Sequence, residues 1–136
     1  MTVSNKAVFS VAGRTETAVT TAAKTTYADD TNAVKIADAG ANGSILTALH
    51  AMPRATATAS MLQVYVSPDD GTTMHLVETA LMAAHTVAAT TAIPVTAFEG
   101  VTQTEPLFLA NGDSLWVGCA VALAGGVAFT ATVEDY

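Results

Sequence analysis

Three histidines and one cysteine are the residues whose types could bind a transition metal: His50, His75, His85 and Cys119. Imidazole nitrogens and a thiolate are zinc ligands, and zinc-binding motifs place pairs of them at short, regular spacings. No His-x-His or Cys-x-x-Cys pair occurs in the chain. We therefore predict that these four residues lie on strand faces or in loops, and that the chain has no metal site.

Two pairs of acidic residues could offer oxygen ligands to calcium, namely Asp29-Asp30 and Asp69-Asp70. An EF-hand loop needs acids at alternating positions, a central glycine and a distal glutamate, and neither segment has that pattern. Carboxylate pairs for glycoside hydrolysis are defined by spatial separation and leave no sequence motif. With one Trp, three Tyr and four Phe, the chain is poor in sugar-stacking residues. We expect the acids in solvated turns and Trp116 in the core or an interface.

Motifs for nucleotide binding and for nucleophilic catalysis are absent. Gly40–Ser44 has the glycines of a phosphate-binding loop but not its lysine, and no Gly-x-Ser-x-Gly elbow occurs. Asn42-Gly43-Ser44 matches a glycosylation acceptor, but no secretion signal supports it. We predict no catalytic residue, no cofactor and no enzyme activity.

Composition excludes several classes of partner. Twelve acidic against five basic residues give a net charge of −7, which disfavours nucleic-acid binding by counterion release and docking to an anionic membrane. The uncharged run from Leu115 to Phe129 is shorter than the roughly 20 residues of a membrane helix, and Gly118, Gly125 and Gly126 interrupt it. Two buried strands joined at a glycine turn explain it. A single cysteine leaves no internal disulfide.

Apolar and polar residues alternate with period 2, which is typical of half-buried strands. Met61–Val66 is the clearest case, and the turn-forming Ser67–Thr73 leads from it into a second strand at Met74–Glu78, which predicts a hairpin. The segment Glu78–Ala89 reads as a strand end followed by an extended loop. Further strands are predicted at Val8–Val11, Ala33–Ile36, Ile45–Met52, Ile93–Phe98, Pro106–Leu109, Leu115–Leu123 and Val127–Val133.

This density of short strands and turns predicts an all-β fold, an antiparallel β-sandwich of jelly-roll type with an extended N-terminal arm. Residues 1–32 would form the arm and first strand, and residues 33–136 the sandwich, within a single domain. The part from Gly13 to Asn32 is rich in Thr, Ala and charge and has few large apolar groups. We interpret it as an arm that could wrap a neighbour, or as a surface loop.

Several segments resemble a known kind of protein. They are Ser44–Leu49, the Thr/Ala run Ala55–Ala59, Leu62–Ser67 with Asp69–Thr73, Asn111–Val117 and the final strand ending Glu134-Asp135-Tyr136. Over roughly residues 33–136 the chain resembles small all-β virion proteins of tailed bacteriophages, particularly head decoration (cement) proteins.

The resemblance implies a non-catalytic protein on the outer capsid surface, present in the host cytoplasm during assembly. Its partners would be the major capsid protein and copies of itself, as a dimer or trimer, with no direct nucleic-acid or membrane contact. The alternative is a phage tail or receptor-binding module with carbohydrate affinity. That alternative predicts that Trp116 or Tyr65 is exposed beside polar groups.

Overall fold

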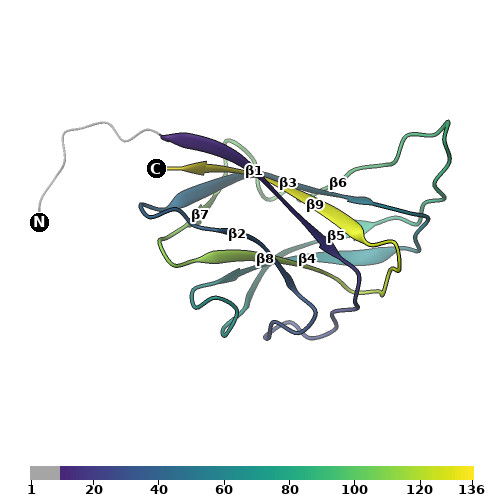
Figure 1. The fold of residues 1–136 in the computed structure, drawn as a ribbon, viewed down its shortest axis with the longest axis horizontal. Coiled ribbons are helices and arrows are strands. Elements are labelled where there is room, and N and C mark those ends of the chain that lie inside the picture. Colours follow the sequence, from purple (N-terminus) through teal and green to yellow (C-terminus); the bar gives the residue numbers. More distant parts are fainter. Residues whose placement is uncertain (1–9) are drawn as a thin grey trace, which may run out of the picture.

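Two antiparallel sheets pack face to face in the computed structural model, which describes residues 10–136 (Figure 1). Nine strands occur in this range, and neighbouring strands in each sheet run antiparallel. The prediction of an all-β antiparallel sandwich is confirmed. None of residues 10–136 belongs to a helix that could cross a membrane.

The first sheet, sheet A, has the strand order β1-β9-β3-β6, and β7 pairs with β3 beside β6. The second sheet, sheet B, has the order β2-β8-β4-β5. The strands of sheet A are β1 (Ala12–Thr20), β3 (Ser44–Pro53), β6 (Thr96–Ala97), β7 (Leu107–Leu109) and β9 (Val127–Asp135). Those of sheet B are β2 (Val34–Asp38), β4 (Ser60–Ser67), β5 (His75–Met82) and β8 (Ser114–Cys119).

The core lies between the two sheets and follows the alternation of the sequence. In β9 the inward residues Val127, Phe129, Ala131 and Val133 are fully buried, while the residues between them face outward. Sheet B contributes the alternate residues of its central strands, and the loop residue Phe98 packs with its ring centroid 6.3 Å from that of Phe129. Burying an aromatic ring of this size stabilises a fold by about 3 kcal/mol or more, judged from the usual effect of its removal.

The predicted hairpin at residues 61–78 is present as β4 and β5. Its turn requires left-handed backbone at Asp70 (φ 54°) and Gly71 (φ 99°), which glycine adopts without strain. The Ser67 hydroxyl accepts a hydrogen bond from the Gly71 amide at 2.7 Å. These local interactions explain why the sequence alone predicted the turn.

The predicted strand Leu115–Leu123 is too long. Strand β8 ends at Cys119, and Val121 is 39% exposed instead of facing the core. The Ala120 amide still bonds to the Met61 carbonyl, at 2.9 Å, but the Val121 amide is taken by the Ser60 hydroxyl. The chain then crosses to sheet A, where β9 begins, so the glycine turn joins the two sheets and not two paired neighbours.

The interpretation of residues 13–32 as an arm or loop is wrong for residues 13–20. These residues belong to β1, which pairs with β9 from Ala12↔Asp135 to Thr20↔Val127. An edge strand needs hydrogen bonds from only one partner strand, here β9, and Thr is favoured in strands, so a Thr-rich sequence can form it. Of the strand predicted at Val8–Val11, residues 8 and 9 lie outside the described residues, and the observed strand begins at Ala12. The one predicted at Ile93–Phe98 is reduced to Thr96–Ala97.

Candidate functional site

The structure places the three histidines and the cysteine on separate elements. His50 is on β3, His75 begins β5, and His85 bridges to Ala57 in the loop after β5. Cys119 is fully buried at the end of β8, with its Sγ 3.5 Å from the Ala22 carbonyl oxygen. Within residues 10–136, no group of three or more His, Cys, Asp or Glu side chains is arranged to hold a metal ion.

The two acidic pairs lie in turns and bind protein groups there. The Asp69 carboxylate accepts hydrogen bonds from the Ser67 hydroxyl (2.9 Å) and the Thr73 amide (2.6 Å). The interaction with Thr73, supported by Ser67, lowers the pKa of Asp69. Asp70 forms an ion pair with Lys35 at 2.9 Å. Asp69 therefore stabilises the β4–β5 turn from within, and Asp70 ties the turn to Lys35 of β2.

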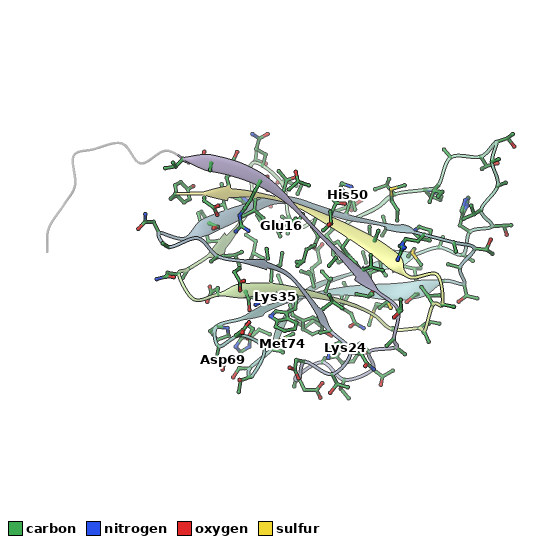
Figure 2. The ribbon with its side chains drawn as sticks, viewed as in Figure 1. Glu16, Lys24, Lys35, His50, Asp69 and Met74 are labelled. Atoms are coloured by element: carbon green, nitrogen blue, oxygen red, sulfur yellow. The ribbon has the colours of Figure 1, made fainter. Side chains whose placement is uncertain are left out.

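Lys24 is a buried cation that organises the loop between β1 and β2. Its ammonium donates to the carbonyl oxygens of Asp29 (2.6 Å) and Thr31 (3.0 Å), and it lies 3.3 Å from the Asp29 carboxylate. It also lies 5.2 Å from the centre of the Tyr65 ring, on the side of sheet B away from sheet A (Figure 2). Sequence reasoning missed this residue, because nothing in a Thr/Ala-rich segment indicates that a lysine is buried.

The carboxylate that faces Lys24 is itself strongly stabilised in its charged form. Asp29 Oδ1 accepts hydrogen bonds from the Thr26 hydroxyl (2.8 Å) and the Thr31 amide (3.0 Å). These bonds, with a smaller contribution from Lys24, lower the pKa of Asp29 to about 2. The cluster holds the loop onto the sheet.

Of the two aromatic residues named for carbohydrate binding, Tyr65 is not displayed for stacking and Trp116 is partly exposed. Tyr65 is fully buried, its hydroxyl donates to Gln63 at 2.8 Å, and desolvation raises its pKa to about 12. Trp116 is partly covered, and its indole N–H donates to the Ser114 hydroxyl at 2.8 Å. A sugar platform needs an open ring face with polar neighbours, which Tyr65 cannot offer.

The best candidate for a functional surface is the outward face of sheet A. The register pairs Thr15 with Thr132 and Thr17 with Thr130 across β1 and β9. Directly opposed residues share a face, and their neighbours along β9 point into the core, so these four threonines point outward. Val19, Ala48 and Ala128 extend the same face, because β1, β3 and β9 are adjacent. We call these seven residues the threonine face. His50 and Met52 of β3 border it on the same side of the sheet, opposite Thr130 and Ala128.

The threonine face carries little charge. Glu134 is the acidic side chain beside it on β9, whereas Arg14 and Glu16 belong to the inward set of β1, opposite Val133 and Ala131. The ammonium of Lys35 also lies away from this face, with Asp38 and Asp70 near sheet B. Small, uncharged side chains on adjacent strands allow another protein to approach closely with little desolvation cost.

Comparison with protein-family models, curated proteins and solved structures finds no match to this chain.

Proposed function

We propose that this chain is a non-catalytic virion protein that binds the outer surface of a tailed-bacteriophage head and stabilises the assembled capsid. The observation that carries the proposal is the threonine face, which is suited to protein contact and holds no charged side chain. The proposed partners are the major capsid protein and further copies of the chain.

The physical properties of the threonine face support a docking role. Protein interfaces are depleted of charged residues at their centres, and Thr and Ala lose little side-chain entropy when they are immobilised. Only 12% of the residues in the chain are charged, against about 25% in ordinary domains. A face of this kind forms a contact whose strength depends on area and fit.

The strand order supports the jelly-roll form of the sandwich. Consecutive strands change sheet at every connection except β4–β5 and β6–β7, and the sheets read β1-β9-β3-β6 and β2-β8-β4-β5. Eight-stranded jelly rolls are built from two Greek keys and are common among viral capsid proteins. In this arrangement β6 and β7 share the place of one strand beside β3.

Stabilisation of a shell follows from mass action. A protein that binds the assembled lattice, and not its free subunits, shifts the equilibrium towards assembly by an amount that grows with its concentration. Many identical sites on a closed shell add up, so each contact can be modest. This mechanism needs a rigid sandwich with an accessible face and no chemical step.

Binding to purified phage heads tests the proposal. The double variant Thr15→Glu/Thr132→Glu places two charges at the centre of the threonine face and should reduce head binding at least tenfold. Thr72→Glu, on the exposed β4–β5 turn, is the matched control and should bind normally. Heads with the bound chain should also melt at a higher temperature. Confinement of the chain to tails, or glycan binding that Trp116→Ala abolishes, would overturn the proposal.

A further inference from the structure

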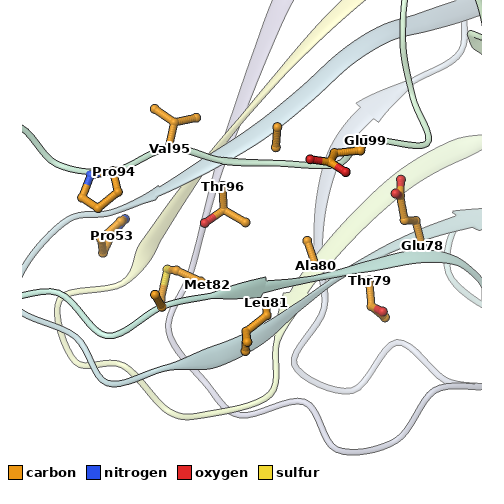
Figure 3. Close-up of a pocket in the computed structure, with 12 residues that line it drawn as sticks. Pro53, Glu78, Thr79, Ala80, Leu81, Met82, Pro94, Val95, Thr96 and Glu99 are labelled. Carbon is orange, nitrogen blue, oxygen red and sulfur yellow. The ribbon is translucent and has the colours of Figure 1, made fainter.

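A groove runs along the side of the sandwich where β5, the edge of sheet B, faces β6 and β7 of sheet A. Its larger part has a volume of about 470 Å³ and lies between β5 and the segment Pro94–Ala97, closed at one end by Pro53 (Figure 3). A second part of about 310 Å³ continues towards Pro106 and Leu107. Glu78 lines both parts, so the two form one elongated depression.

Strand β5 presents an unpaired edge to this groove. It is the last strand of sheet B, and β4 is its neighbour on the other side. It also exposes apolar side chains: Leu76 and Val77 are each 41% exposed and Leu81 is 74% exposed. An exposed, apolar edge strand of eight residues is a template for pairing with another extended segment.

The groove is acidic and lacks a cation. Glu78, Glu99 and Glu105 line it, and no lysine or arginine is among its lining residues. Glu78 Oε1 accepts a hydrogen bond from the Gly100 amide at 2.8 Å. Its Oε2 is buried and has no hydrogen-bond partner among residues 10–136. A buried carboxylate oxygen without a donor is costly, and an ammonium group would satisfy it.

Residues 1–9 have the sequence that such a groove would accept. Met1, Val3, Ala7 and Phe9 alternate with Thr2, Ser4 and Lys6. Asn5 falls in the first set and Val8 in the second, so the period-2 pattern has one largely apolar face with a single polar residue on it. Lys6 is the one charged side chain in this segment, and its charge is opposite to that of the groove. These residues lie outside the described part of the chain.

We infer that residues 3–9 of a second copy of the chain add to the edge of β5 as a further strand, with Lys6 paired to Glu78. Backbone hydrogen bonds to β5 supply affinity in this mode of recognition, and alternate side chains supply specificity. The apolar side chains of the added strand pack on Leu76 and Leu81. This contact would be the site of the self-association that the proposed function includes, and it rests on that function.

The short connection between residue 9 and β1 shows that residues 3–9 would reach β5 of a second copy and not β5 of their own chain. If residues 3–9 lie along β5, two residues remain before Ala12 at the start of β1. Residue 9 and Ala12 are then three Cα–Cα steps apart, which span at most about 11 Å. Strand β1 is at the opposite edge of sheet A, three strand spacings from β6, or about 14 Å. Because the same chain cannot bridge this distance, the exchange occurs between copies, and a reciprocal pair is the simplest closed form.

Sedimentation velocity on the full chain, without capsids, tests the inference. The wild-type chain should form a dimer at micromolar concentration, and Lys6→Glu or Glu78→Lys alone should weaken it at least tenfold. Mixing the two variants should restore the dimer, because each copy then complements the other at both sites. Glu134→Lys makes the same charge change beside the threonine face and should leave the dimer intact.

Three results would overturn the inference: a monomer at all concentrations up to the millimolar range, a dimer unaffected by Lys6→Glu, or no recovery on mixing two folded variants. If Glu78→Lys fails to fold, Glu99→Lys takes its place in the same mixing experiment. Because the sedimentation experiment contains no capsids, the absence of a dimer would not count against head binding, which is tested separately. Likewise, the Thr15→Glu/Thr132→Glu variant should still form the dimer, so its loss of head binding would not count against the contact at β5.

Discussion

The Arg14 guanidinium donates to the Asp135 carboxylate across the pairing of β1 with β9, with Nε 3.0 Å from Oδ2. The same guanidinium lies 2.9 Å from Glu16 and donates to the Asp38 backbone carbonyl at the end of β2. Asp135 also accepts a hydrogen bond from the Ser44 hydroxyl of β3. One arginine therefore ties the edge strands of both sheets together on the side opposite the groove.

Loss of this link should weaken the sandwich. Asp135→Ala removes the acceptor for both Arg14 and Ser44, and charged hydrogen bonds of partly exposed groups contribute about 1–2 kcal/mol. We expect the free energy of unfolding in urea to fall by about that amount. Glu134→Ala removes the adjacent charge, which forms no ion pair among residues 10–136, and should change the free energy of unfolding by less than about 0.5 kcal/mol. Equal effects of the two variants would contradict the role assigned to Asp135.

Acid should destabilise the fold through carboxylates whose pKa is lowered. Hydrogen bonds from Thr26 and Thr31 lower the pKa of Asp29 from 3.8 to about 2, and the Ser44 hydroxyl, with Arg14, lowers that of Asp135. A group with a lowered pKa in the folded state stabilises it above its unfolded pKa, and this contribution is lost as the pH falls through the folded value.

The melting temperature should therefore be constant near neutral pH and decline between about pH 4 and pH 2. Asp29→Asn should melt lower than the wild type at pH 6 and show a shallower decline, because its side chain no longer titrates. Parallel curves for the two proteins in this range would argue against the contribution of Asp29.

Lys24 should be more important for stability than an exposed lysine. Lys24→Met keeps the length of the side chain but leaves the Asp29 and Thr31 carbonyl oxygens without their donor, which should cost about 1–3 kcal/mol. Lys35→Met is the matched control: its ion pairs with Asp38 and Asp70 are solvent-exposed, so their loss should lower the free energy of unfolding by less than the loss of Lys24 does. Urea unfolding of both variants measures the difference, and a larger loss for Lys35→Met would refute it.

Alanine substitutions at three glycines can distinguish the cost of backbone strain from the cost of a steric clash. Gly126 has φ +79°, and a Cβ there would lie 2.7 Å from Val19 Cγ1. Gly112 has φ +95° with open space, and Gly13 has neither constraint. Gly13→Ala should leave the free energy of unfolding almost unchanged. Gly112→Ala should lower it by about 1 kcal/mol, and Gly126→Ala should lower it most. The melting temperatures should follow this order, and a Gly126→Ala variant as stable as Gly112→Ala would rule out the clash.

The interior strands were predictable because their side chains alternate and their turns have local signals. Leu62, Val64 and the turn around Gly71 specify β4 and the hairpin from neighbouring residues alone. Strand β1 has no such signal. Its inward residues include Arg14 and Glu16, whose charges are compensated by Asp135 and by each other. The part supplied by Asp135 exists only once distant segments have met.

The candidate surfaces were not predictable for the same reason. The threonine face combines Thr15 and Thr17 with Thr130 and Thr132, which are neighbours only through the register of β1 and β9. The burial of Lys24 depends on carbonyl oxygens that converge in the folded loop. Sequence patterns identify which residues alternate, but they do not identify which strands are adjacent.

The pairing of β1 with β9 also constrains when the protein can fold. Arg14 and Asp135 are 121 positions apart, and β1 has β9 as its partner strand in sheet A. On the ribosome, β1 emerges early and stays without that partner until nearly all of the described residues have been synthesised. Contacts so distant in sequence slow folding. Sheet A is therefore completed only after residues 21–126 have been synthesised, and β1 lacks its partner strand throughout that interval.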